Sequence, residues 1–236
     1  HDMSGAIGLG AKSELLEELT RLEEADSRLQ IERGRVLLAT MADRLRADGA
    51  TAIAPLHRHG GIVETIIERE EDARLVVIGK RGASHEFATD HIGSKIERVV
   101  RASAKPVLIA ARASQAPQSV VLAYDGSKPA DRALERVANS PLFAGLPIQV
   151  VTVGPDDDKH RALLDKARTA LSAIASVTLT IVPGKPEDVI AERMAATPQA
   201  LLVMGAYGHS PLRTLIVGST TTTLIRTVHA PVLLVR

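Results

Sequence analysis

LLVMGAYGHSPLRTLIVGST, residues Leu201–Thr220, runs from an apolar segment into a loop with regularly placed glycines. Gly205 ends the apolar segment, Gly208 follows, and Gly218-Ser219-Thr220 come after nine further residues. A similar pattern lies upstream in LVVIGKRGASHEFATDHIGSK, residues Leu75–Lys95. The chain therefore contains the same strand-and-loop unit twice.

The two copies lie at nearly the same offset throughout, which indicates a domain duplication. Gly79 corresponds to Gly205 at 126 residues, and Pro106 to Pro231 at 125 residues. This period is far too long for a solenoid repeat. Between the copies, ASQAPQ is small, polar and contains proline, as linkers often are. We therefore expect a first domain over 1–112, a linker over 113–118 and a second domain over 119–236.

The second half alternates strand and helix patterns. Its apolar, β-branched runs predict strands, and its apolar residues at helical spacing predict helices. The expected strands cover 119–125, 147–153, 177–184, 200–205 and 229–236, and the expected helices cover 129–140, 158–175, 186–196 and a last one that contains Leu224, Ile225 and Val228. Such alternation predicts an α/β fold with a parallel sheet covered on both faces.

The first half has the same ending but a different beginning. Residues 14–48 predict a helix with Leu15, Leu19, Leu22 and Leu29 on one face, and Gly34 is expected to bend or break it. A short strand (TAIAP, 51–55), a helix (62–70) and strands at 74–79 and 104–112 follow. Nothing before residue 14 resembles SVVLAYDGS, residues 119–127. The first domain thus lacks its N-terminal strand-helix-strand; either the chain is a fragment or this half is a reduced unit.

The glycine loop of the second half predicts a mononucleotide site. In an open parallel sheet, ligands bind beyond the carboxyl ends of the strands, where the strand order reverses. Gly205 and Asp125 each follow a predicted strand, so both are expected at this edge. Gly218-Ser219-Thr220 begin a helix, whose free N–H groups favour an anion. The alternative is purely structural, since glycine is a common turn residue and serine a common N-cap.

The spacing G-x2-G-x9-G-S-T, followed by a helix and PVLLVR, resembles the universal stress protein family, and YDGS after an apolar strand matches that family's first-strand aspartate and serine. The resemblance covers 119–236 and, less completely, about 14–112. It implies two adenine-nucleotide alpha-hydrolase-like domains in tandem, each of strand order 3-2-1-4-5. It also implies pairing of domains through their last strands, as a homo-oligomer or within one chain, and a stress-response role.

The resemblance further implies ATP binding in the second domain. Asp125 would contact the adenosine, the backbone of Val153 the adenine, and Gly205, Gly208, Gly218, Ser219 and Thr220 the ribose and phosphates. Mg²⁺ is expected with the nucleotide, since it commonly bridges phosphates. The first half departs from the pattern because ten residues separate Gly82 from Gly93, Lys95 replaces the threonine, and the first-strand aspartate is absent.

Other candidates are weaker. His57 and His59 lack further ligands at metal spacing. Lys80, Arg81 and His209 can reach a phosphate or face solvent. The acidic run Asp156–Asp158 can bind a cation or cap a helix. No nucleophile–base set is evident, so we expect a regulatory ATP-binding protein rather than an enzyme. A slow ATPase and a non-nucleotide interaction module using the fold for dimerisation stay open.

Composition excludes several classes of protein. The net charge is +1, from 29 basic and 28 acidic residues, and aromatic residues make up 2% of the chain. This argues against nucleic-acid binding by a basic face or by base stacking. No apolar run is long enough to span a membrane, and the first ten residues do not form a signal peptide. The absence of cysteine excludes disulfides and fits a cytoplasmic protein.

Overall fold

The computed structural model describes residues 4–58, 60–80, 92–111, 115–206 and 219–236. The chain divides into two compact units, 1–60 and 61–236. Among the described residues, the first unit holds one long helix and an irregular segment, and the seven strands belong to the second. Everything that concerns the predicted nucleotide site therefore belongs to the second unit.

The first unit is dominated by α1, Ser4–Ala47, in which the leucines predicted to share a face are 46–62% exposed. The predicted bend at Gly34 is wrong, because α1 continues through it. A Cβ on Gly34 would lie 2.6 Å from the imidazole of His57, so this glycine makes room for a ring. The predicted strand at 51–55 is also wrong, since the unit offers no neighbouring strand to pair with it.

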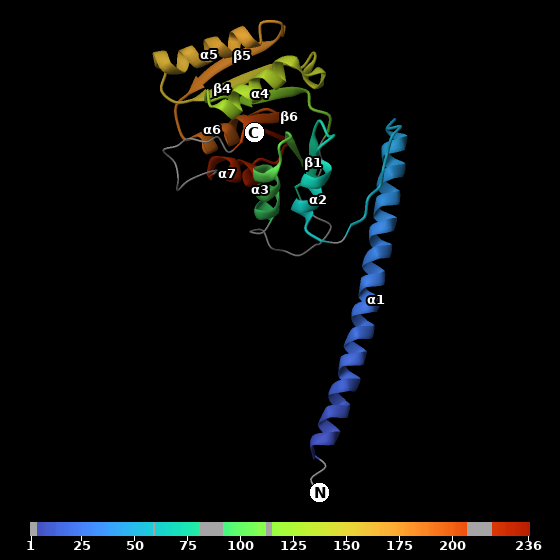
Figure 1. The fold of residues 1–236 in the computed structure, drawn as a ribbon. Coiled ribbons are helices and arrows are strands. Elements are labelled where there is room, and N and C mark those ends of the chain that lie inside the picture. The colour runs from blue at the N-terminus through green and yellow to red at the C-terminus, as the bar shows by residue number, and fades with distance from the viewer. Residues whose placement is uncertain (1–3, 59, 81–91, 112–114, 207–218) are drawn as a thin grey trace. The chain divides into compact units, whose positions relative to one another are not determined.

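The second unit is one mixed sheet with helices on both faces (Figure 1). Its strands lie in the order β1-β2-β7-β6-β3-β4-β5. The strands are β1 (Val76–Gly79), β2 (Val107–Ala110), β3 (Ser119–Ala123), β4 (Ile148–Val153), β5 (Val177–Val182), β6 (Ala200–Gly205) and β7 (Val232–Val235). The helices are α2 (Ile62–Arg69), α3 (Ile92–Ala102), α4 (Lys128–Asn139), the 3-10 helix η1 (Pro141–Phe143), α5 (Asp158–Ala170), α6 (Pro186–Ala196) and α7 (Ser219–Thr227).

The second half confirms the predicted strand order. In the order of the chain, its strands β3, β4, β5, β6 and β7 are arranged 3-2-1-4-5, and all four neighbouring pairs are parallel. β3 lies in the middle, with Ala123 opposite Val151 of β4 and Met204 of β6. The sheet therefore has the reversal of strand order on which the site prediction depends, between β3 and β6.

The two halves join through their last strands, as the family resemblance implied. β2 and β7 are antiparallel, and Ile109 lies opposite Val232 while Val107 lies opposite Leu234. β1 extends the sheet as a parallel neighbour of β2. The pair of last strands is thus formed within a single chain, and both halves contribute to one continuous sheet.

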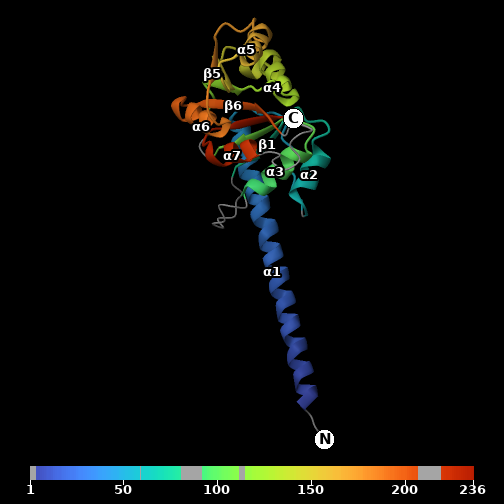
Figure 2. The same ribbon diagram turned by 90° about the vertical axis from the view of Figure 1, so that its left-hand side faces the viewer.

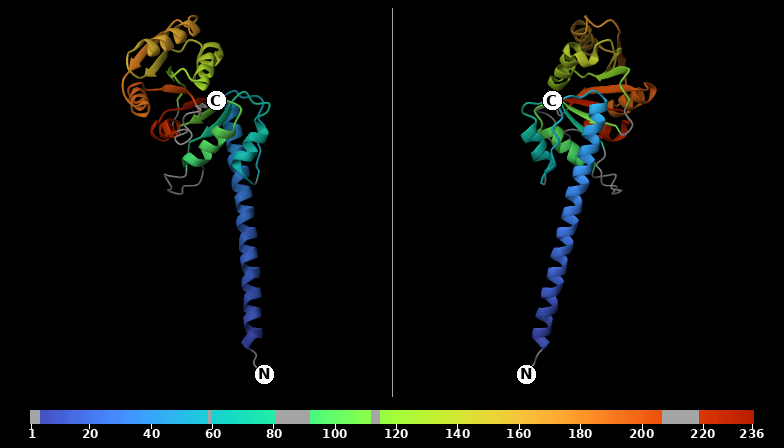
Figure 3. Two further views of the ribbon diagram at one scale, coloured as in Figure 1. Left: turned by 60° about the vertical axis from the view of Figure 1, so that its left-hand side comes forward. Right: turned by 90° about the vertical axis from the view of Figure 1, so that its right-hand side faces the viewer.

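Two layers of helices bury the sheet. α4 and α5 cover one face, where Leu134 and Ala167 pack on the strands, and α2, α3, α6 and α7 cover the other, as Figures 1, 2 and 3 show. Every residue of β6 up to Met204 is buried. A strand covered on both faces needs a continuous apolar run, which explains why ALLVM does not alternate.

Candidate nucleotide-binding site

Three predicted site residues lie at the same edge of the sheet. Val153 ends β4, Gly205 ends β6, and Asp125 comes two residues after β3, the strand between them. Because the three strands are parallel, their carboxyl ends share this edge. The strand order reverses between β3 and β6, so a crevice is expected beside Asp125.

Asp125 is exposed at this edge and is held by a local turn. Its Oδ1 atom accepts a hydrogen bond from the Ser127 amide at 2.9 Å. Gly126 between them has φ +73, and a Cβ there would meet the side chain of Leu163. The turn therefore requires glycine, and among the described residues the second carboxylate oxygen, Oδ2, has no hydrogen-bond partner. Ser127 also begins α4, because its hydroxyl accepts from the Ala130 amide.

Tyr124 anchors the backbone that carries Asp125. Its carbonyl accepts a buried hydrogen bond from the Thr152 hydroxyl at 2.9 Å, which ties the end of β3 to β4. Its phenol donates to Asp131 Oδ1 at 2.7 Å, and Lys166 Nζ donates to the same oxygen at 2.7 Å. Asp125 thus stands on backbone fixed from two sides, which keeps its carboxylate in place without a ligand.

Two of these groups, the Tyr124 phenol and the Asp131 carboxyl, have shifted pKa values. Burial and then the hydrogen bond to Asp131 raise the pKa of the Tyr124 phenol well above its usual range, so the phenol stays a donor. Partial burial acts to raise the pKa of Asp131, but the hydrogen bonds from Lys166 and Tyr124 outweigh it and lower that pKa below its usual range. Asp131 is therefore ionised at neutral pH.

Gly205 also has a packing role, independent of the ligand contact predicted for it. A Cβ on it would lie 2.5 Å from the Ala130 amide nitrogen and 2.7 Å from the Pro129 carbonyl carbon. Both are backbone atoms in the first turn of α4, which cannot move away cheaply. The position therefore requires glycine to let α4 approach the end of β6, whether or not a ligand lies nearby.

Val153 is half-buried beside a residue that the sequence analysis missed. The imidazole of His160 packs against Gly154, the next residue, and its Nδ1 atom lies 2.6 Å from Asp157 Oδ1. Asp157 caps α5 by accepting from the His160 amide, and this hydrogen bond, followed by the one from the ring, lowers the pKa of the Asp157 carboxyl. Thr152, Tyr124 and His160 carried no sequence signal, because each acts through a partner on another element or turn.

The phosphate end of the predicted site is described in part. α7 begins at Ser219, where the sequence predicted a helix start, and Thr220 is half-buried. The end of α7 leads to β7 at the amino edge of the sheet, and a helix of 9 residues spans about 14 Å, so its first turn points toward the carboxyl edge. Gly208 and Gly218 lie outside the described residues.

A sequence profile described as "Universal stress protein family" matches residues 5–111 and 156–236, which is most of the chain. The chain belongs to the universal stress protein family. The match includes β1 and β2 in the first half and the glycine loop with β7 in the second. Tandem universal stress protein domains in one chain agree with the two halves of the sheet.

Known universal stress proteins resemble the chain over most of its length. A universal stress protein of Synechocystis sp. is 33% identical over 238 residues, which covers all of this chain and 83% of that protein. A universal stress protein structure from Archaeoglobus fulgidus superposes with a TM-score of 0.71 at 29% identity, covering 87% of this chain and 76% of the other. A third, from Pseudomonas aeruginosa, has a TM-score of 0.59 at 16% identity over 85% and 77% of the two chains, and shows the shared fold alone.

In the first half, the end of β1 differs from the end of β6 in the second half. Lys80 follows Gly79 of β1, and its ammonium donates to the Val228 carbonyl at 2.6 Å and to the Arg226 carbonyl at 3.4 Å. Lys80 thus binds the C-terminal end of α7 in the other half, which is where a cation stabilises a helix. Arg81 and Gly82 lie outside the described residues, and within the described part of the chain β1 pairs only with β2.

The remaining candidates give no metal site. Among the residues that the structure describes, no three His, Asp or Glu side chains are grouped so that they could hold a metal ion. Asp156 pairs with Arg161 at 2.8 Å and Asp157 caps α5, so this acidic loop acts as a helix cap. His59 and His209 lie outside the described residues. None of the helices in the described ranges combines the length and apolar character needed to cross a bilayer.

Proposed function

We propose that the second half of this universal stress protein binds an adenine nucleotide, ATP, as a regulatory ligand in the cytoplasm. The observation that supports it is Asp125, an exposed carboxylate fixed by the Ser127 amide beside the reversal of strand order. A carboxylate held in place before binding costs less to order when a ligand arrives. Its Oδ2 atom is available to accept a hydrogen bond from a ribose hydroxyl.

The other residues of the proposed site bind through their backbone and hydroxyl groups. Val153 presents its main chain at the end of β4 to the adenine, and the first turn of α7 presents amide groups and the Thr220 hydroxyl to the phosphates. Gly208 and Gly218 complete the loop in this proposal. Gly205 contributes indirectly, because it lets α4 and therefore Asp125 lie against β6.

Mg²⁺ fits this donor set as a companion of the phosphates. It prefers oxygen ligands, keeps several waters and commonly uses one carboxylate together with phosphate oxygens. The described residues provide no cluster of acidic side chains for an all-protein metal site. The proposed metal would therefore arrive with the nucleotide, and Mg²⁺ alone should bind weakly.

We propose ATP binding rather than ATP hydrolysis because of the chemical groups expected at the carboxyl edge of the sheet. Backbone amides and a hydroxyl can hold phosphates, and the Asp125 carboxylate can hold the ribose. Fast hydrolysis, however, needs charge stabilisation aimed at the transition state and a positioned water. A regulatory ligand acts by binding two states with different affinity. The antiparallel pair β2–β7 also supports the second candidate, an interaction module that uses the fold for pairing alone.

The test is to purify the full chain, denature it and assay the supernatant for adenine nucleotide, then add ATP with Mg²⁺ to the nucleotide-free protein. At 100 times its dissociation constant, a ligand stabilises the folded state by about 2.7 kcal/mol, so the melting temperature should rise by several degrees. If no nucleotide co-purifies and ATP leaves the melting temperature unchanged, the interaction-module reading replaces this proposal.

A further inference from the structure

A cavity lined by four arginines lies in the region where the two halves of the sheet meet. Its volume is about 440 Å³. Arg74 precedes β1 in the first half, Arg132 and Arg136 lie one turn apart on α4 in the second half, and Arg236 follows β7. Pro106, just before β2, and Val235, at the end of β7, form part of its wall. We call these four side chains and their cavity the arginine pocket.

In the described lining of the arginine pocket, guanidinium groups outnumber acidic side chains. Glu135 is the single acidic residue in the described lining. Within the described part of the chain, none of the four guanidinium groups forms an ion pair with a carboxylate side chain. Four positive groups around one cavity repel each other, and an anion placed among them would remove that repulsion.

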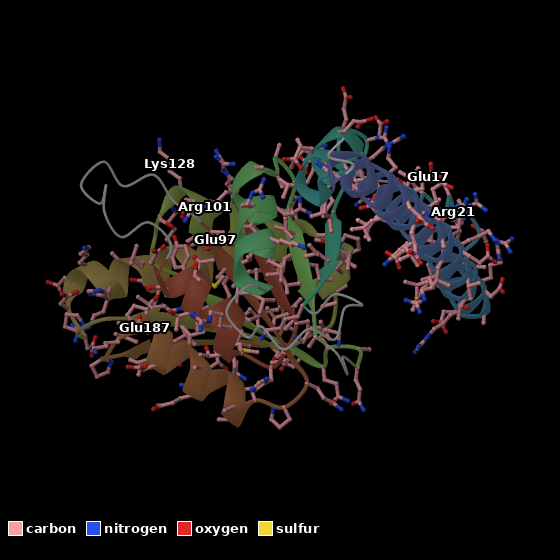
Figure 4. The ribbon with its side chains drawn as sticks, turned by 90° about the horizontal axis from the view of Figure 1, so that it is seen from below. Glu17, Arg21, Glu97, Arg101, Lys128 and Glu187 are labelled. Atoms are coloured by element: carbon pink, nitrogen blue, oxygen red, sulfur yellow. The ribbon has the colours of Figure 1, made fainter. Side chains whose placement is uncertain are left out.

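Most of the guanidinium donors also remain available. Arg132 donates one N–H to a main-chain oxygen of Arg236, the last residue of the sequence, at 2.9 Å, and Arg236 donates to the carbonyl of Arg101. Arg101 itself pairs with Glu97 along α3, where Figure 4 labels both side chains. Asn139 and Ser140, also in the lining, are neutral groups that can donate further hydrogen bonds.

The fold does not explain why α4 carries these arginines. The helix buries Ala133, Leu134 and Val137 against the sheet, and that apolar stripe is sufficient to hold it there. Arg132, Glu135, Arg136 and Asn139 form a second stripe at helical spacing that faces the cavity. Arg74, which precedes β1 in the other half, lines the same cavity as this polar stripe of α4.

We propose that the arginine pocket binds an anion made of linked phosphate groups. Guanidinium groups bind phosphate through paired, charge-assisted hydrogen bonds, and several of them together favour more than one phosphate. The cavity volume falls within the range of small-molecule sites, about 300–1,000 Å³. Its described lining contains no aromatic residue against which a base could stack, so the pocket fits an inorganic polyphosphate better than a nucleoside.

The arginine pocket is separate from the proposed nucleotide site. It shares no residue with Asp125, Val153, Gly205 or the first turn of α7. Its ligand would contact Arg74 from one half together with Arg132 and Arg136 from the other. Binding there would therefore hold the two halves together across the β2–β7 pair, and would not require ATP.

The test is isothermal titration calorimetry of the full chain with sodium tripolyphosphate at low ionic strength. The wild type is expected to show saturable binding. Losing one paired charge-assisted contact should weaken binding about tenfold. Arg132→Gln/Arg136→Gln should therefore lose tenfold or more in affinity, and Arg74→Gln should lose several-fold. The control is Arg168→Gln on α5, whose arginine pairs with Asp165 outside the pocket and should leave the affinity unchanged.

Three results would overturn the proposal. The first is a wild-type protein that shows no saturable heat with tripolyphosphate. The second is an Arg132→Gln/Arg136→Gln protein that melts like the wild type and binds as tightly as Arg168→Gln. The third is loss of tripolyphosphate binding in Gly208→Val, since this would place the anion in the nucleotide site. Because the four arginines are exposed or half-buried, their replacement should leave the fold intact.

Discussion

β6 in the second half and β1 in the first half both end in a glycine, yet the residues around these two ends differ. At the end of β6, Gly205 lies against the first turn of α4, and that helix follows the turn that carries Asp125. At the end of β1, Lys80 reaches across to the last turn of α7 in the other half. The duplicated strand thus ends beside the proposed nucleotide site in one half and at a contact between halves in the other.

In the proposed nucleotide site, the glycine loop is only one of two walls. In the second half, β3 brings Asp125 to the opposite wall, and Thr152 and Asp131 fix the residue before it. In the first half, β1 has β2 as its single partner among the described strands. Nucleotide binding should therefore follow the strand that faces the loop rather than the loop itself.

Breaking the packing at Gly205 should have the largest effect. Gly205→Ala places a methyl group within 3 Å of the Pro129 and Ala130 backbone, and overpacking of this kind costs about 2–3 kcal/mol. The free energy of unfolding, measured by urea denaturation, should fall by that amount. The matched variant Gly79→Ala changes an exposed glycine of β1 and should cost less than about 1 kcal/mol. Equal losses in the two variants would show that the two strand ends pack alike.

Removing the carboxylate opposite the loop should come second. Asp125→Ala is expected to weaken ATP binding about tenfold or more, equivalent to about 1.4 kcal/mol, because the ribose loses its acceptor. Gly208→Val should abolish binding while the chain stays folded. Calorimetric titration with ATP and Mg²⁺ measures both. The control is Asp72→Ala, which removes an exposed aspartate of the first half. If Asp125→Ala binds ATP as tightly as Asp72→Ala does, Asp125 is not part of the site.

Neutralising the contact between halves should have a smaller effect on stability. Lys80→Met leaves the Val228 carbonyl without its ammonium donor and removes a cation from the end of α7, which should cost about 1–2 kcal/mol. Thermal unfolding measures the loss. Lys128→Met, at the exposed start of α4 (Figure 4), should stay within about 0.5 kcal/mol of the wild type. A Lys80→Met protein as stable as Lys128→Met would argue against a role for this contact.

The smallest effect concerns the support behind Asp125. The folded-state pKa of Asp131 lies below its ordinary value, so its carboxylate stabilises the fold at neutral pH, and this contribution is lost as the pH falls through the folded pKa. Asp131→Asn should cost less than about 1 kcal/mol at pH 7, and the difference from the wild type should shrink below about pH 4. Urea denaturation at several pH values measures it. A difference that stays constant with pH would mean that the Asp131 charge does not stabilise the fold.

The sequence predicted the elements of the second half well, because burial on both faces of a parallel sheet imposes long apolar runs. The predicted bounds of α6 and β6 coincide with the structure. Residues 51–55 failed as a strand because a strand needs a neighbour, which local pattern does not reveal. That strand was predicted from the five residues TAIAP alone.

The site was predicted less completely, and for a different reason. Asp125, Val153 and Gly205 meet at one edge, as the strand order required. Sequence could not tell whether Gly205 makes room for a ligand or for the first turn of α4. It also could not find the target of Lys80, which lies 148 residues away, or the arginine pocket, which is assembled from separate segments. Such contacts depend on tertiary structure and leave no local pattern.

The antiparallel pair β2–β7 has a consequence for how this protein can change over time. In a symmetric homodimer, any substitution at the shared strands appears on both sides of the two-fold axis. Here Ile109 faces Val232 and Val107 faces Leu234, so the two sides are encoded separately. One side can therefore acquire a Lys80 while the corresponding position on the other remains Ala206. The covalent connection frees the interface from symmetry and lets each half specialise.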